Sequence, residues 1–292
     1  MKKATTIDEQ IELYENRNCE LDIDEKEIKQ ILMDVGYFRL GFYSFPFEET
    51  YPKKENRTHI YKTGTKFSDI VSLYKFDFAL KMALIKYLFL IEINFRAKLI
   101  YFASNYFTDK TWFVNPKIMT DKYIRNFPEK VYKSIKENSI VVKQHHKKHP
   151  TDIYAPAWKT LEYATFGNIV TTYEALLDKN LKTTISNEYK IRNESIMLNY
   201  IRAVKDVRNV VAHGRVLFDY NLEDSLKNGP ALAITDKNKN KLFSVILVMK
   251  YLLESISSEL PNDMEKEIRQ VFGSLDSNKT LKDIAINCSG YL

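Results

Sequence analysis

The segment from Phe67 to Ser104 constrains the fold more than any other part of the chain. Its apolar residues recur with helical spacing, while charged residues such as Lys75, Asp77 and Glu92 interrupt it. A membrane-spanning helix needs about 20 predominantly apolar residues, so these charges argue against a membrane span. We therefore expect one long helix, broken at most once and buried over most of its circumference.

The rest of the sequence also favours helices. Only 8 Gly and 8 Pro occur in 292 residues, of which 45% are hydrophobic, so turns are few and core material is ample. We predict an all-α helical bundle with extra helices, with room for one small β-hairpin pairing 231–235 with 241–245. No repeat or linker divides the chain, so residues 1–292 are expected to form a single domain.

The segment from Ser195 to Phe218 carries the most informative polar residues. Its apolar side chains recur at three- and four-residue intervals, as in an amphipathic helix with one buried face. Arg202, Asp206, Asn209 and His213 share a second stripe, because offsets of 4, 7 and 11 residues return close to the starting angle. The sequence therefore predicts four polar groups on one helix face.

Arg208 lies on a different side of this predicted helix. A five-residue offset places it about 140° round the axis from His213, so one helix can hardly bring both side chains to one phosphate. Gly214 is a natural end for the helix and puts the imidazole in its last turn. Arg and His together suit a phosphate ligand, but a His that caps helix carbonyls beside a surface Arg explains the pattern equally well.

The net charge of +6 and the pI near 8.9 are compatible with RNA binding. Several basic residues have an alternative explanation: Arg39 lies among aromatic residues that are more often core than a stacking surface, and Arg96 can form a structural ion pair with Glu92. The sequence from 143 to 149 (KQHHKKH) is predicted to be a mobile basic loop. The candidate RNA-binding residues are Arg39, Arg96, Lys143, His145, His146, Lys147, Lys148, Arg202 and Arg215.

Several kinds of chemistry lack their sequence signatures. The chain has no GxxxxGK or GxGxxG phosphate loop, no HExxH and no GxSxG. His145 and His149 have the spacing of a helical metal pair, but no third ligand accompanies them. We expect neither a metal nor an organic cofactor. Cys19 and Cys288 lie far apart in the sequence and no signal peptide is visible, which favours a cytoplasmic protein.

Five separated segments together resemble one known family. In chain order they are GYFRLGFYSFPF, YKTGTKFSDIVSLYKFD, IEINFRAKL, WKTLEYATFGNIVTTY and VRNVVAHGRVLF. This order is similar to that of the abortive-infection AbiD/AbiF-like proteins of bacterial phage defence, over about residues 30–220. The helical segment from about 222 to 292 lies outside the resemblance and is expected to be an extension.

The last of these segments looks like the Arg-Asn-x3-His signature of HEPN domains. The resemblance implies a HEPN-like helical bundle, a homodimer and metal-independent RNA cleavage that leaves a 2′,3′-cyclic phosphate. It assigns catalysis to Arg208, Asn209 and His213. Family members commonly carry a second His at the signature, whereas this chain has one.

The function expected from the resemblance is an endoribonuclease that stops growth on phage infection. A structured noncoding RNA is expected to restrain it, as in a toxin–antitoxin pair. Three alternatives stay open: an RNA-binding module that does not cut, a protein-interaction partner whose aromatic residues 37–47 are exposed, and a helical scaffold.

Overall fold

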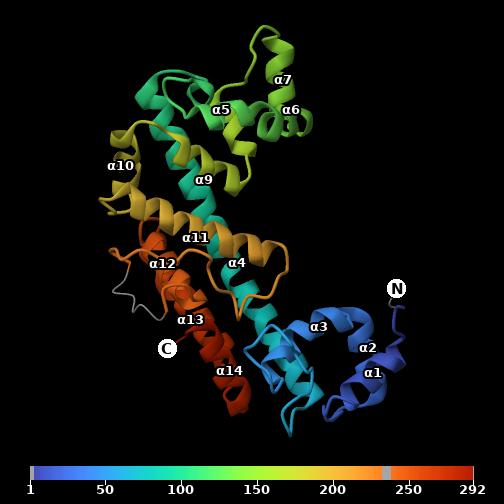
Figure 1. Cartoon of the computed structure of the whole chain (residues 1–292). Helices are drawn as coiled ribbons and strands as arrows, with labels where there is room; N and C mark the ends of the chain where they lie inside the picture. The colour runs from blue at the N-terminus through green and yellow to red at the C-terminus, as the bar shows by residue number, and fades with distance from the viewer. Residues whose placement is uncertain (1–2, 232–237, 292) are drawn as a thin grey trace. The chain divides into compact units, whose positions relative to one another are not determined.

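A computed structural model describes residues 3–231 and 238–291, and its regular elements there are helices (Figure 1). In chain order they are α1 (Ile7–Glu15), α2 (Glu25–Val35), α3 (Tyr37–Ser44), η1 (Phe45–Phe47), α4 (Phe67–Phe107), η2 (Trp112–Val114), α5 (Asp121–Phe127), η3 (Pro128–Tyr132), α6 (Lys133–Asn138), α7 (Ile140–Lys148), α8 (Ala157–Thr160), η4 (Leu161–Tyr163), α9 (Phe166–Ala175), α10 (Lys179–Asn187), α11 (Glu194–Ala212), α12 (Leu242–Glu254), α13 (Leu260–Gly273) and α14 (Lys279–Ser289).

The all-α prediction is confirmed, and the structure differs from it at the expected hairpin. Residues 232–237, which include most of the first expected strand, lie outside the described residues. The second expected strand, 241–245, is helical from Leu242 onward. Leu242, Val245 and Met249 are buried at helical spacing, so burial of one helix face prevails over the local turn signal.

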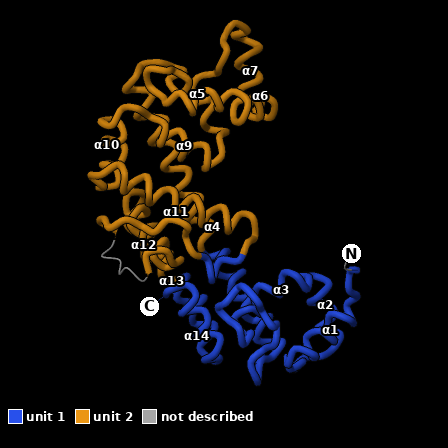
Figure 2. The backbone as a smooth tube through the Cα atoms, viewed as in Figure 1, with its two compact units in different colours: residues 1–83, 216–220, 267–292 blue, residues 84–215, 221–266 orange. Residues whose placement is uncertain are grey.

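The chain divides into two compact units, coloured separately in Figure 2. Unit 1 contains residues 1–83, 216–220 and 267–292, and unit 2 contains residues 84–215 and 221–266. The expected C-terminal extension therefore contributes to both, because α12 belongs to unit 2 and α14 to unit 1.

Unit 1 begins with helices whose ends follow the local sequence. The Thr6 side chain caps α1 in a capping box with Glu9. Asp24 caps α2 by accepting a hydrogen bond from the Lys26 N–H, and Gly36 ends that helix with a φ of 88°, a conformation that favours glycine.

A buried carboxylate on α4 organises the interior of unit 1. Asp77 is fully buried and accepts hydrogen bonds from the Tyr43 hydroxyl at 2.7 Å and from Lys81 Nζ at 2.8 Å. Its other oxygen accepts the backbone N–H groups of Leu217 and Phe218, at 2.9 and 2.7 Å. Asp77 thereby anchors residues 217–218 within unit 1 and has all its acceptor positions used.

Unit 2 is built on the two helices that the sequence predicts best. α4 runs unbroken, and α11 begins at an Asn193 cap and buries Met197, Ile201 and Val204 on one face. α11 packs against α9, α10 and α12. The predicted amphipathic helix is therefore confirmed, and its apolar face is covered within the unit.

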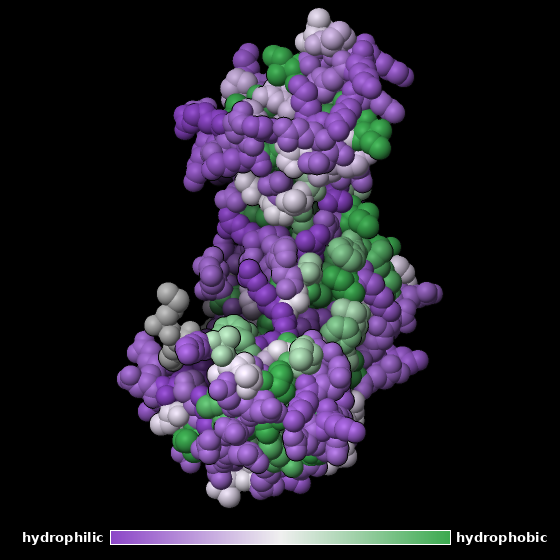
Figure 3. Space-filling view, turned by 90° about the vertical axis from the view of Figure 1, so that its right-hand side faces the viewer, coloured by the Kyte–Doolittle hydropathy of each residue, from purple (hydrophilic) through white to green (hydrophobic). Residues whose placement is uncertain are grey.

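The long helix α4 is less buried than its composition predicts. Phe78, Met82, Phe89 and Ile93 are between 42% and 57% exposed. Apolar side chains also gather in patches on the face of the molecule shown in Figure 3. Across the described part of the chain, no helix combines the length and apolarity needed to cross a bilayer.

Candidate functional site

The end of α11 places His213 on the surface. The Gly214 N–H bonds to the Val211 carbonyl and the Arg215 N–H to the Val210 carbonyl, with Gly214 at a φ of 61°. This is the hydrogen-bond pattern of a Schellman motif. His213 is the residue between the helix and this turn, its side chain is exposed, and within the described residues its imidazole has no polar partner.

The Arg208 guanidinium forms an ion pair with a carboxylate on α4. Its Nε lies 2.9 Å from Glu92 Oε2, and its Cζ lies 5.6 Å from the centre of the Phe89 ring. One terminal nitrogen donates a long hydrogen bond of 3.4 Å to Asn209 Oδ1. The Glu92 side chain is only 6% exposed and that of Arg208 is 22% exposed. The guanidinium therefore bridges a buried anion and the surface.

Glu92 also binds the second arginine that the sequence singled out. Arg96 donates a hydrogen bond of 2.7 Å to Glu92 Oε1 and one of 3.1 Å to the Ala164 carbonyl. The structural ion pair considered for Arg96 is thus present. The link from Glu92 to Arg208 has no signal in the sequence, because 116 positions separate the two residues.

Among the described residues, no hydrogen bond or ion pair joins Arg208 to His213. The structure brings Arg208 and Asn209 together and leaves His213 at the following turn. The divergence of the Arg208 and His213 side chains stays a prediction from helical geometry, which sets them about 140° apart.

A polar groove of about 620 Å³ lies beside Asn209, between α9, α11 and residues 222–224. Its lining has more acids than bases, and both bases are paired, Arg202 with Glu174 at 2.5 Å and Lys205 with Asp206. The polar stripe predicted from the sequence is therefore split, because Arg202, Asp206 and Asn209 face this groove and His213 does not. The lining residues are Gly167, Val170, Thr171, Glu174, Asn199, Arg202, Ala203, Lys205, Asp206, Asn209, Leu222, Glu223 and Asp224.

The basic sequence at 143–149 is helical up to Lys148, and the prediction of a loop was wrong there. His145 is buried, with its Nε2 3.1 Å from Asp152 Oδ2, and His146 Nε2 lies 2.7 Å from the Tyr132 hydroxyl. These internal partners favour a helix over a solvated loop. Lys143, Lys147 and Lys148 are exposed on α7. An RNA contact in this segment stays a prediction, and these exposed lysines suit it better than the two histidines do.

The aromatic segment around Arg39 is part core and part surface. Leu40 and Tyr43 are fully buried, whereas Phe38 is 81% and Phe42 49% exposed. The two phenylalanines pack edge to face, with ring centres 5.2 Å apart. Arg39 and Arg215, two of the candidate RNA-binding residues, are also exposed. Core packing and an exposed aromatic surface thus both occur in this segment.

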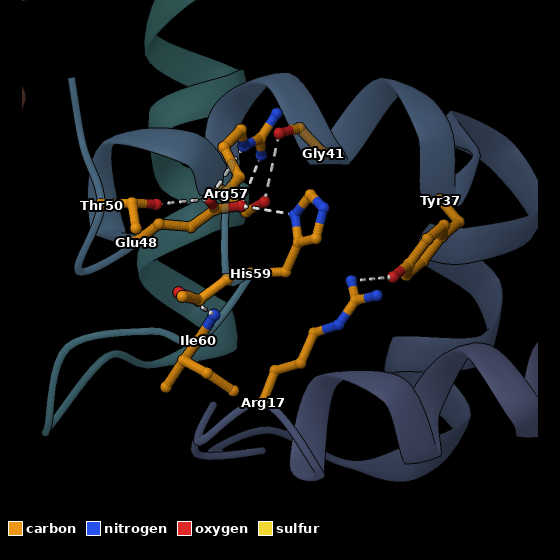
Figure 4. Close-up of polar contacts among 10 residues, drawn as sticks. Arg17, Tyr37, Gly41, Glu48, Thr50, Arg57, His59 and Ile60 are labelled. Carbon is orange, nitrogen blue, oxygen red and sulfur yellow. Dashed lines mark hydrogen bonds and ion pairs between the residues drawn. The ribbon is translucent and has the colours of Figure 1, made fainter. Parts of the chain in front are cut away.

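Unit 1 contains a polar cluster that sequence reasoning did not find (Figure 4). The buried Glu48 carboxylate accepts hydrogen bonds from Arg57, including one of 2.9 Å from Nε, and His59 Nδ1 lies 3.2 Å away. Burial acts to raise the pKa of Glu48, but the bonds from Arg57 and His59 outweigh it and hold that pKa below its ordinary value. His59 has a φ of 59°, which is uncommon for a residue other than glycine.

No group of three or more His, Cys, Asp or Glu side chains among the described residues is arranged to hold a metal ion. Cys19 and Cys288 are both buried, and neither is joined to another cysteine in a disulfide.

Comparisons with known proteins support the family resemblance. The family described as Abi-like protein matches residues 30–219, which include Glu92, Arg96 and the Arg208 to His213 segment. Searches of the curated proteins and of the solved structures returned no match.

Proposed function

Because the chain belongs to the Abi-like protein family, whose name refers to abortive infection of phage-infected cells, we propose that it is a metal-independent endoribonuclease of phage defence. The observation that carries the proposal is the surroundings of Arg208. A buried carboxylate holds its Nε, Asn209 touches one terminal nitrogen, and an exposed His213 follows at the end of the same helix. Such a set can bind a phosphodiester and move its protons.

In the proposed reaction, a ribose 2′-hydroxyl of the RNA attacks the adjacent phosphodiester. The 2′-oxygen attacks phosphorus and loses its proton to a base, the bond from phosphorus to the 5′-oxygen breaks, and that oxygen gains a proton. The products are a 2′,3′-cyclic phosphate and a 5′-hydroxyl. His213 serves as the base or the acid, Arg208 stabilises the charge on the phosphorane oxygens, and Asn209 orients the phosphate.

The proposed site is composite and needs two copies of the chain. Arg208 and His213 diverge on one helix, so Arg208 of one protomer would meet His213 of the other across a two-fold axis. The surface around Arg208 suits such an interface: Phe89, beneath the guanidinium, is 42% exposed, and Ile93 one turn further is 57% exposed. A second copy packed there would cover apolar side chains that a monomer leaves in water.

The first test is RNA cleavage by the purified protein in EDTA. Wild type should release fragments that end in a 2′,3′-cyclic phosphate, and His213→Ala and Arg208→Ala should not. Cleavage that survives both substitutions would remove these residues from the mechanism.

The second test separates a composite site from one within a single chain. When inactive Arg208→Ala and His213→Ala dimers are mixed and allowed to exchange subunits, half of the dimers become mixed and each has one intact site. We expect about one quarter of wild-type activity to return. A site contained in one chain would recover none.

Regulation by a structured noncoding RNA is part of the proposal, supported by the net charge of +6. Sequencing of RNA that co-purifies with wild type and with His213→Ala would identify the ligand and reveal its cleavage. Recovery of the same intact RNA from both proteins, with no cleavage of any RNA, would favour the alternative of an RNA-binding module.

A specific observation favours a second role, as a protein-interaction partner. Phe38 is 81% exposed beside Phe42 on α3, as that hypothesis requires. Loss of phage protection in Phe38→Ser, with RNA cleavage intact, would assign this surface to recognition of a partner.

A further inference from the structure

We propose that Glu92 is a positioning residue for Arg208, an inference that rests on the proposed nuclease function. Glu92 Oε2 accepts from Arg208 Nε at 2.9 Å, and Glu92 Oε1 accepts from Arg96 at 2.7 Å. Both carboxylate oxygens are thus engaged by arginines. The Glu92 side chain is 6% exposed, so water competes little for these bonds.

The contact selects which edge of the Arg208 guanidinium faces a substrate. A guanidinium has five N–H donors in a rigid planar fork, and it grips phosphate through two of them. The buried carboxylate takes Nε, so the edge formed by the two terminal nitrogens is left for a phosphate. One of these nitrogens makes only the long 3.4 Å bond to Asn209. Phe89 lies 5.6 Å from Cζ and limits movement of the plane.

Arg96 makes Glu92 a rigid support. It is 12% exposed, and besides Glu92 it binds the Ala164 carbonyl at 3.1 Å. Glu92 and Arg96 lie one turn apart on α4, so the carboxylate is tied to its own helix and through Arg96 to residue 164. We therefore assign Arg96 to holding Glu92, in place of the RNA contact considered for it from sequence.

Positioning and charge act in opposite directions on RNA binding and on RNA cleavage. Glu92 places a negative charge beside the arginine that is to bind phosphate, so its removal makes the site more positive and does not weaken RNA binding. Its removal also frees the guanidinium to rotate, which slows the chemical step, because small errors of placement cost large factors in rate. A residue that only stabilises the fold would not separate these two quantities.

The test compares Glu92→Gln and Glu92→Ala with wild type and with a matched control, Glu188→Gln. Glu188 follows α10 and pairs at 3.7 Å with Lys98, which lies on α4 as Glu92 does. It has no contact with Arg208. We expect single-turnover cleavage to fall by about 10²-fold in Glu92→Ala and by a smaller factor in Glu92→Gln, which keeps one oxygen acceptor. The Kd for RNA with a 2′-deoxy nucleotide at the cleavage position should not rise by more than about twofold. The control should match wild type.

A spectroscopic arm decides the proposal without any cleavage. In ¹⁵N-labelled protein, the Arg208 Nε–H should exchange slowly with water in wild type and in Glu188→Gln, and fast in Glu92→Gln. Fast exchange in wild type, or an unchanged cleavage rate in Glu92→Ala, would overturn the positioning role. If wild type does not cut RNA, the proposed nuclease fails, while the exchange measurement still tells whether Glu92 holds Arg208. Thermal unfolding identifies a variant that has not folded, and Glu92→Gln then replaces Glu92→Ala.

Discussion

Two buried carboxylates on the same helix, Asp77 in unit 1 and Glu92 in unit 2, have opposite surroundings. Asp77 is fully buried and receives Tyr43, Lys81 and two backbone N–H groups, all inside the unit. Glu92 is almost as buried, but one of its partners, Arg208, reaches the surface. One terminal nitrogen of Arg208 donates a long hydrogen bond of 3.4 Å to Asn209.

This contrast distinguishes a buried anion that only stabilises the fold from one that supports a site. In both places the burial of a charge is compensated by several donors, as it must be. The informative quantity is the number of N–H or O–H groups that each donor has available for another ligand. Tyr43 donates its only O–H to Asp77, whereas the Arg208 guanidinium donates its Nε–H to Glu92 and has N–H groups on its two terminal nitrogens as well. Substitution at Asp77 should therefore affect stability alone, whereas substitution at Glu92 or Arg208 should affect activity as well as stability.

Substitution of Arg208 should change activity most. Arg208→Lys keeps the charge but loses the planar fork that serves a carboxylate and a phosphate together. We expect cleavage to fall by on the order of 10³-fold, nearly as far as in Arg208→Ala. The midpoint of urea unfolding should fall in Arg208→Ala, which leaves a buried Glu92 oxygen without its donor, and should fall less in Arg208→Lys, which keeps the charge. A lysine variant with near-normal activity would show that charge alone is needed and that orientation by Glu92 is irrelevant.

The second effect tests whether Asp77 is purely structural. Asp77→Ala leaves Lys81 and two backbone N–H groups buried without their acceptor, so we expect the free energy of unfolding to fall by about 3–5 kcal/mol. Asp77→Asn keeps an oxygen and should cost less. Urea denaturation measures both, with Asp276→Asn, whose carboxylate is 63% exposed, as the control. A loss of under about 1 kcal/mol in Asp77→Ala would contradict a structural role for Asp77.

The third effect concerns pH and the Glu48 cluster. The pKa of folded Glu48 lies below its ordinary value of 4.5, so its contribution to stability is present above that pH and is lost as the pH falls below it. Glu48→Gln lacks this titration. Between about pH 6 and pH 3, wild type should lose more of its free energy of unfolding than the variant. Parallel stability curves for the two proteins would contradict the assignment.

We expect the least change at a carboxylate that is only partly buried. Glu265 pairs with Lys250 in unit 2, and the two side chains are 33% and 36% exposed. Glu265→Gln should change the free energy of unfolding by less than about 1 kcal/mol and leave cleavage unchanged. A larger loss would show that burial alone does not rank the carboxylates of this protein.

The candidate site was only partly predictable from sequence. The position of Gly214 predicted the end of the helix, because helix termination is local. The divergence of Arg208 and His213 stays a prediction from helical geometry. Their joint role in RNA cleavage stays a prediction. The same local reasoning failed for residues 145–148, where partners such as Asp152 and Tyr132 come from other segments and favour a helix.

The all-α class, the long helix α4, and the apolar face and the end of α11 could be predicted from the sequence, since these follow from residue spacing and from the conformation that Gly favours near helix ends. Three contacts could not be predicted from the sequence. Glu92 pairs with Arg208 across 116 positions, Asp77 accepts hydrogen bonds from the backbone of residues 217–218, and Glu48 contacts Arg57 and His59. The physical reason is that the partner of a buried charge depends on which helices pack together. That choice is made by the apolar surface of the whole chain, so no spacing near the charged residue records it.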